Sequence, residues 1–273
     1  MDNFIPFPIL LLLPIAMVLG AVVGSFLNVV ILRLPPRMLE EATETIVWPP
    51  SRCPACRQGI RWYDNIPLLS FIWLQRRCRA CGAAISWRYP LVEATMALLS
   101  VALLLRFGPQ AQYLVYFIFS AALLAIFFID LDHQLIPDVI SLPGIALGFA
   151  AALLPGGIGW QAAGLGILLG GGSFYLVALG YYLLTRREGM GGGDIKLLAM
   201  LGAFLGWQAL PFIILASSLL GLVVGIGAMI HQGRGGRSVI PFGPFLVLAA
   251  WLWLFFPAQI DHLWQRLFGL PIG

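Results

Sequence analysis

Charged residues are scarce in this sequence: they make up 10% of its 273 residues, whereas apolar residues make up 60%. A soluble domain carries about one quarter charged residues, so the composition excludes an ordinary soluble protein. The long apolar runs also lack the alternation of apolar and polar residues that is typical of transmembrane β-strands. Since about 20 residues of helix cross a bilayer, we predict an all-α polytopic membrane protein with about eight transmembrane helices.

The first residues of the chain lack the basic segment of a signal peptide, and the apolar stretch that follows is longer than a signal-peptide core. We therefore expect an uncleaved transmembrane helix over residues 1–32, with the N-terminus outside. Nine of the 16 Lys and Arg residues then fall between Arg33 and Arg88, which indicates a cytoplasmic loop. Beside a bilayer, this charge favours attraction to anionic lipid over binding to nucleic acid. Residues 89–273 are expected to form a seven-helix transmembrane core.

Cysteine is also rare, and all four cysteines lie in the basic loop. They form two C-x2-C pairs separated by 21 residues, Cys53 with Cys56 and Cys78 with Cys81. This spacing is typical of a tetrahedral zinc site. Two disulfides are the alternative, but a cytoplasmic position keeps thiols reduced. We therefore predict a structural zinc-binding domain over residues 33–88, with no open position at the metal for water or substrate.

Acidic residues gather at only two boundaries of apolar segments. One boundary is Ile129–Asp138, which contains Asp130 and Asp132, and the other is Asp194, which directly follows three glycines. Ionisable groups at such positions are costly and indicate function. The expected topology brings both boundaries to the cytoplasmic face, so we predict that they meet in a site with two carboxylates.

Two carboxylates in one site share a proton, so one can activate water while the other polarises a carbonyl, as amide hydrolysis requires. The residues alone leave Asp130, Asp132 and Asp138 as nearly equal candidates for the partner of Asp194, and Asp138 could simply cap the helix after Pro137. All of these acids could instead be ordinary loop charges and helix caps.

Other acids and other functions also stay open. Glu93, near the start of the second helix, could contact substrate or cofactor, or could only pair with Arg88. A transporter would use boundary acids to relay protons, but it would distribute them through the membrane. A non-catalytic scaffold of a secretion machine would tolerate the loss of both Asp130 and Asp194.

Several motifs together resemble the type IV prepilin leader peptidase and N-methyltransferase family, whose members are membrane aspartic proteases of the Gly-x-Gly-Asp type. The resemblance covers most of the chain. The segments that carry it are Gly24–Pro35, the two cysteine pairs, Arg88–Glu93, Ile129–Asp138 and Gly191–Asp194 with the following Ile195 and Lys196.

The resemblance implies that Asp130 and Asp194 are the catalytic pair and that Cys53, Cys56, Cys78 and Cys81 bind zinc. It further implies cleavage of the basic leader of type IV prepilins and type II secretion pseudopilins, at the cytoplasmic face of the bacterial inner membrane. Methylation of the new N-terminus by S-adenosylmethionine would follow. We also expect the acids Glu40, Glu41 and Glu44 to help dock the basic leader.

Overall fold

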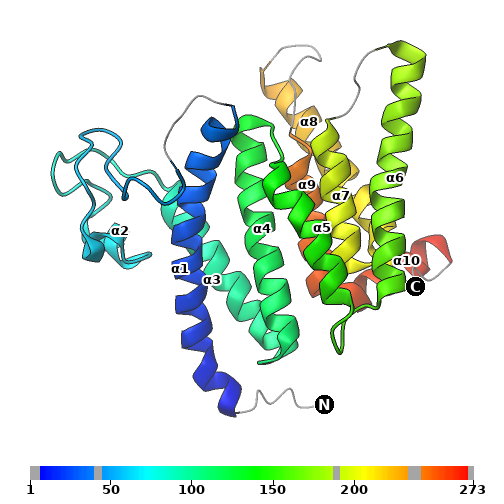
Figure 1. Ribbon diagram of the computed structural model, residues 1–273, viewed down its shortest axis with the longest axis horizontal. Coiled ribbons are helices and arrows are strands. Elements are labelled where there is room, and N and C mark those ends of the chain that lie inside the picture. Colours follow the sequence, from blue (N-terminus) through cyan, green and yellow to red (C-terminus); the bar gives the residue numbers. More distant parts are fainter. Residues whose placement is uncertain (1–6, 40–44, 187–190, 233–240, 270–273) are drawn as a thin grey trace. The chain divides into compact units, whose positions relative to one another are not determined.

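The computed structural model describes residues 7–39, 45–186, 191–232 and 241–269, and Glu40, Glu41 and Glu44 lie outside these ranges (Figure 1). Within the described residues every regular element is a helix, accompanied by isolated β-bridges between Arg52 and Gly59 and between Arg77 and Ala84. The predicted all-α membrane fold is thus confirmed. The chain forms two compact units, residues 1–125 and 126–273, whose boundary lies within helix α4.

The first unit contains two long helices that pack closely along each other. Its elements are α1 (Phe7–Met38), η1 (Trp62–Asn65), α2 (Leu69–Trp73), α3 (Arg88–Phe107) and most of α4 (Ala111–His133). Glycine permits the contact between α1 and α3, since a Cβ on Gly20 would lie 2.6 Å from the carbonyl oxygen of Met96. The side chain of Asn28, for which an apolar bundle requires a polar partner, donates a hydrogen bond to the carbonyl of Tyr89 at 3.1 Å.

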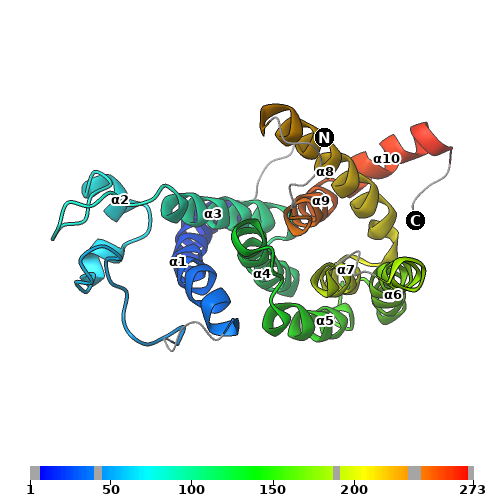
Figure 2. The same cartoon turned by 90° about the horizontal axis from the view of Figure 1, so that it is seen from above.

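The second unit is built around a buried helix, α7 (Gly192–Leu205). The surrounding elements are α5 (Asp138–Ala152), α6 (Trp160–Thr185), η2 (Trp207–Ala209), α8 (Leu210–Gln232), α9 (Gly243–Phe255) and α10 (Pro257–Phe268). Every residue of α7 from 197 to 205 is buried, and a helix that is apolar on all sides belongs in an interior. Both α5 and α6 pack directly on α7, and the three lie side by side when viewed from above (Figure 2).

Small residues bring these helices together. A Cβ on Gly144 of α5 would lie 2.5 Å from the sulfur of Met200, and a Cβ on Gly170 of α6 would lie 2.6 Å from the carbonyl oxygen of Leu198. Gly166 and Gly202 face each other so closely that a Cβ on either would collide with the carbonyl of the other. The position of α7 therefore depends on the absence of side chains at its contacts.

Eight transmembrane helices are not confirmed. Among the described residues, five helices are long and apolar enough to cross a membrane, or six if α9 and α10 count as one bent span. The difference has a physical basis, because α5 and α7 have only 15 and 14 residues. At 1.5 Å per residue each is shorter than the hydrocarbon core of about 30 Å. The last pair is bent by 101°, so α10 cannot continue the direction of α9.

We predict that Gly202→Ala will weaken the packing of α6 on α7. The added methyl must displace the backbone at Gly166, and overpacking of this kind costs about 1–3 kcal/mol. The melting temperature of the detergent-solubilised protein should fall by several degrees. Gly172→Ala in α6 is the matched control, since its Cβ would meet no described atom within 4 Å. Equal melting temperatures for the two variants would contradict this account of the interface.

Candidate active site and cysteine cluster

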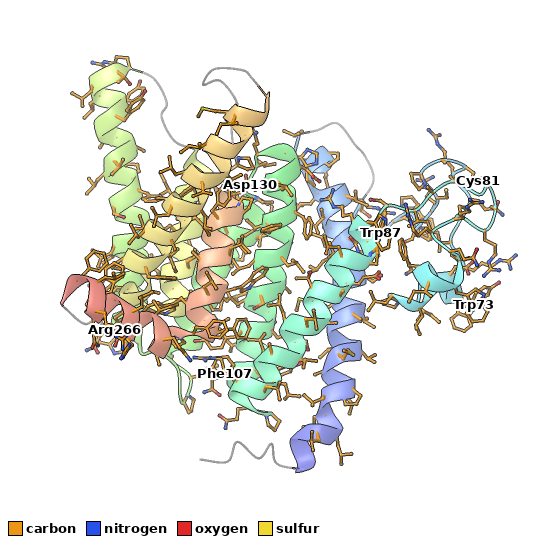
Figure 3. All side chains as sticks on the ribbon, turned by 180° about the vertical axis from the view of Figure 1, so that it is seen from behind. Trp73, Cys81, Trp87, Phe107, Asp130 and Arg266 are labelled. Atoms are coloured by element: carbon orange, nitrogen blue, oxygen red, sulfur yellow. The ribbon has the colours of Figure 1, made fainter. Side chains whose placement is uncertain are left out.

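Asp130 lies in the last turn of α4 and is buried, with 5% of its surface exposed (Figure 3). It follows a run of apolar residues that includes the fully buried Ile126 and Ile129. A carboxylate in such surroundings requires a hydrogen-bond donor. The donor is the backbone N–H of Gly243, at 2.9 Å from Oδ2 of Asp130.

Gly243, the first residue of α9, is a part of the site that sequence reasoning missed. A Cβ at this position would lie 2.6 Å from Oδ2 of Asp130, so only glycine lets the backbone come this close. The available signal was the run Pro241-Phe-Gly-Pro244, a glycine between two prolines at the start of an apolar helix. Proline suits the first turn of a helix, and Pro244 stands there.

Asp194 lies in the first turn of α7 and is half-buried. The two predicted acids come together: Asp194 is close enough to Asp130 for the charge of one carboxylate to act on the other. Close packing requires glycine just before Asp194, because a Cβ on Gly193 would lie 2.8 Å from the Cβ of Ile136. The segment after α4 thus packs directly against the start of α7.

The other two acids of the first cluster have different surroundings. Asp132 is exposed. Asp138 begins α5, and Nζ of Lys196 lies 2.8 and 2.7 Å from its two carboxylate oxygens. Pro137 occupies the N-cap position of α5, so Asp138 is not the capping residue. Because both partners are partly exposed, this ion pair stabilises the fold only modestly, but it directs Asp138 toward Lys196.

Glu93 belongs to the first unit and is also buried, at 7% exposure. Its Oε2 accepts a hydrogen bond from the backbone N–H of Leu68 at 2.8 Å, and Ser25 of α1 also hydrogen-bonds to it. Sequence reasoning considered a ligand contact or a pair with Arg88 for this residue. The structure adds a structural role, since Glu93 fastens the cysteine-bearing loop to α3.

The four cysteines form one cluster. Their sulfur atoms all lie within 4.8 Å of one another, and each is a free thiol. The sulfurs of Cys53 and Cys81 are 3.9 Å apart. A tetrahedron with Zn–S bonds of about 2.3 Å has sulfurs about 3.8 Å apart, so the cluster could bind zinc. Residues 45–87, which carry this cluster, are called the cysteine module below.

Local backbone geometry prepares the first thiol of the module for a metal. Backbone N–H groups of Cys56 and Ala55 donate to Cys53 and lower its pKa to about 7, despite the opposing effect of desolvation. The N–H of Ala83 acts in the same direction on Cys81, but desolvation and hydrogen bonds with the other thiols outweigh it and raise the pKa of Cys81 to about 11. Cys53 is therefore the readier thiolate of these two, and a bound cation would favour the thiolate form of its ligands.

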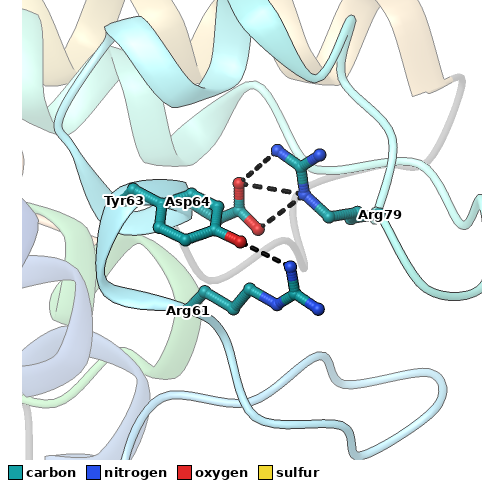
Figure 4. Close-up of polar contacts among 4 residues, drawn as sticks. All are labelled: Arg61, Tyr63, Asp64 and Arg79. Carbon is teal, nitrogen blue, oxygen red and sulfur yellow. Dashed lines mark hydrogen bonds and ion pairs between the residues drawn. The ribbon is translucent and has the colours of Figure 1, made fainter.

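A second contact closes the module (Figure 4). Arg79, which follows the first cysteine of the second pair, forms an ion pair with Asp64 of η1 at 2.7 Å. The hydrogen bonds from Arg79 hold the pKa of the Asp64 carboxyl below its usual value. Arg79 also lies over the ring of Tyr63, with its guanidinium carbon 5.6 Å from the ring centre. The pair thus links η1 to the second cysteine turn.

Comparisons with known proteins agree over nearly the whole chain. Residues 18–107 match the model of the bacterial peptidase A24 N-terminal domain, and residues 117–226 match that of the type IV leader peptidase family. The chain is 40% identical over 268 residues to the prepilin leader peptidase/N-methyltransferase of Pseudomonas aeruginosa, covering 92% of each protein. It is also 40% identical over 270 residues to the Neisseria gonorrhoeae protein of the same name, again covering 92% of each. No solved structure matches the chain.

Proposed function

Because the chain belongs to the type IV leader peptidase family, we propose that it is a prepilin leader peptidase and N-methyltransferase. It would cleave the leader of type IV prepilins and of type II secretion pseudopilins and then methylate the new N-terminal residue. The single observation that best supports this proposal is the 40% identity over 92% of the chain to a protein that carries both activities in its name. The chain is accordingly a multi-pass protein of the bacterial inner membrane, and its N-terminus would lie outside.

The proposed catalytic pair consists of Asp130 and Asp194. Its support is geometric: both carboxylates belong to the same unit, the charge of one acts on the other, and Asp130 is buried with a backbone donor. The carboxylate of Asp138 is already paired with Lys196, and Asp132 is exposed. Of the three candidates left open by the sequence, Asp130 is therefore the one proposed as the partner of Asp194.

The two acids would divide the chemistry between them. The N–H of Gly243 stabilises negative charge on Asp130, and repulsion between the carboxylates then leaves the shared proton on Asp194. Ionised Asp130 would remove a proton from a water molecule, which attacks the scissile carbonyl carbon. Asp194 would give its proton to the carbonyl oxygen, which forms a tetrahedral intermediate with two hydroxyl groups. When the C–N bond breaks, the proton taken by Asp130 would pass to the leaving amine, and a hydroxyl of the intermediate would return a proton to Asp194. The site would open to the cytoplasmic face.

The cysteine module would bind a structural zinc ion through Cys53, Cys56, Cys78 and Cys81, since four thiolates fill a tetrahedral zinc site. The ion would close the module and take no part in cleavage. S-adenosylmethionine would supply the methyl group for the second reaction.

Replacing either acid of the pair should abolish cleavage. In membranes, Asp130→Asn and Asp194→Asn should each cut a prepilin at least about 100-fold more slowly, because general acid–base catalysis is lost. Asp132→Asn and Asp138→Asn are matched controls that should cut normally. Protein abundance would be compared by immunoblot. Normal cutting by both dyad variants would contradict the aspartic mechanism and favour a scaffold, while loss only at Asp132 would move the assignment to that residue.

Gly243→Ala tests whether the backbone donor matters for the reaction. Its Cβ would lie 2.6 Å from Oδ2 of Asp130, so either the carboxylate or the start of α9 must move. A displacement of about 1 Å in an active site can cost about 100-fold in rate, and we expect a loss of this order in prepilin cleavage. Gly227→Ala in α8, whose Cβ would meet no described atom within 4 Å, should cleave normally. Wild-type kinetics for Gly243→Ala would remove this glycine from the site.

Removing two ligands should empty the proposed zinc site. Purified wild-type protein should contain about one zinc per chain, and the double variant Cys53→Ser, Cys56→Ser should contain none. Limited proteolysis should then cut within residues 45–87, and methylation should fall more than cleavage. Gln58→Ser, an exposed change in the same turn, serves as the control. Absence of zinc from the wild type would contradict the site, and equal loss of both activities would contradict their separation.

A further inference from the structure

The short helix α2 carries an apolar face that no described part of the chain covers. Leu69, Ile72 and Trp73 are 63%, 72% and 81% exposed, and their spacing places them on one side of the helix. Phe71, by contrast, is buried, and its ring packs against that of Trp87 with the centres 5.0 Å apart. The helix is thus anchored by one side chain and presents three large apolar side chains outward, which marks a contact surface.

The tether between Leu68 and Glu93 determines where this face lies along the membrane-crossing direction. Leu68 directly precedes α2, and its N–H donates to Glu93, the sixth residue of α3. Five residues of helix rise about 7.5 Å, so α2 starts beside the second turn of α3 and not beyond its end. In Figure 1, α2 accordingly lies level with the body of α1.

This level coincides with the edge of the bilayer. The 20 residues of α3 have an apolar composition suitable for a membrane span, and 20 residues of helix only just cross a hydrocarbon core of about 30 Å. Glu93, about 7.5 Å along the helix from the first residue of α3, therefore lies at or inside the boundary between headgroups and acyl chains. The exposed Leu91 in the first turn of α3 presents apolar surface at the same level.

The composition of the module suits the same boundary. Trp62, Trp73 and Trp87 are all more than 60% exposed, and tryptophan is enriched at membrane interfaces. The guanidinium of Arg76 lies over the ring of Trp87, with its carbon 4.8 Å from the ring centre. Asp64 is the one acidic residue in the sequence 45–87, whereas six arginines lie there, so the module attracts anionic headgroups. Figure 3 shows Trp73 at the opposite edge of the module from Cys81.

We propose that α2 is an interfacial membrane helix, whose face of Leu69, Ile72 and Trp73 lies in the lipid leaflet on the side of the cysteine module. The partner is lipid and not protein, because the tether holds this face beside the body of a transmembrane helix, where lipid is the surrounding medium. Anionic headgroups would lie against the arginines of the module. Through α2, the cysteine module then contacts the bilayer directly and does not lie wholly in the aqueous phase. This inference requires only that α3 spans the membrane, and it is independent of the catalytic proposal.

The test measures the depth of α2 in the full-length protein, reconstituted in nanodiscs of zwitterionic lipid with a fraction of anionic phosphatidylglycerol. A nitroxide-bearing unnatural amino acid replaces Ile72 in one variant and the exposed Gln58 in the other, so the cysteine cluster stays intact. Collision rates with oxygen, which concentrates in lipid, and with a water-soluble nickel chelate are obtained from power saturation. Ile72 is already exposed, so the label displaces no core residue.

We expect the ratio of oxygen to nickel collisions to be several-fold higher at position 72 than at position 58. Equal ratios would overturn the proposal. So would a label at position 72 that meets the nickel chelate freely and becomes protected only when purified prepilin is added, because the face would then bind protein. Prepilin cleavage is measured on the same nanodiscs: a shallow label with full cleavage contradicts this inference alone, and a deep label without cleavage bears only on the catalytic proposal.

Discussion

A carboxylate placed among apolar helices needs a donor, and this requirement connects distant parts of the second unit. Asp130 ends an apolar run of α4 and receives its hydrogen bond from Gly243, 113 residues further along the chain. Burial without that bond would cost several kcal/mol. The contact also requires the absence of a Cβ, so the acid and the glycine constrain each other. The end of α4 and the start of α9 are consequently held in register by one backbone N–H, and the geometry of the proposed dyad depends on that register.

The second acid is held by packing, and none of the hydrogen bonds among the described residues anchors its carboxylate as Gly243 anchors Asp130. Asp194 lies in the first turn of α7, whose residues 197–205 are all buried. The contacts of α7 with α5 and α6 are made at glycines. Close packing leaves α7 little freedom to shift or rotate, so the carboxylate at its start is positioned by a rigid element. The role of Gly193 is similar: it leaves room for Ile136, which brings the segment after Asp130 against the start of α7. The packing of apolar side chains and glycines around α7 thus positions Asp194 relative to Asp130.

Local patterns in the sequence were sufficient for some of these features and not for others. The four cysteines could be identified because each C-x2-C pair lies within a few residues of sequence, and the structure brings the two pairs into one cluster. Asp130 and Asp194 were candidates because acids are rare at apolar boundaries. Gly243 was missed because its partner is distant in sequence, and the Asp138–Lys196 pair was missed for the same reason. Eight spans stay a prediction, because composition shows that a segment is apolar but not how long its helix is, and α5 and α7 have only 15 and 14 residues.

The cysteine module lacks a hydrophobic core large enough to stabilise it. Among its described residues only Cys53 and Phe71 are buried apolar side chains, which is far too little surface to stabilise a fold of this length. Three other restraints replace a core: the cysteine cluster, the Asp64–Arg79 pair and the bond from Leu68 to Glu93. The first two act within the module, whereas the third ties it to α3, and Arg33 of α1 donates to the carbonyls of Thr45 and Ile46. These hydrogen bonds lie in short segments of the module, and a contact through the apolar face of α2 would add a restraint on its orientation. Under the interfacial proposal, contact of the exposed tryptophans with lipid supplies apolar burial that the module's own few buried side chains do not provide.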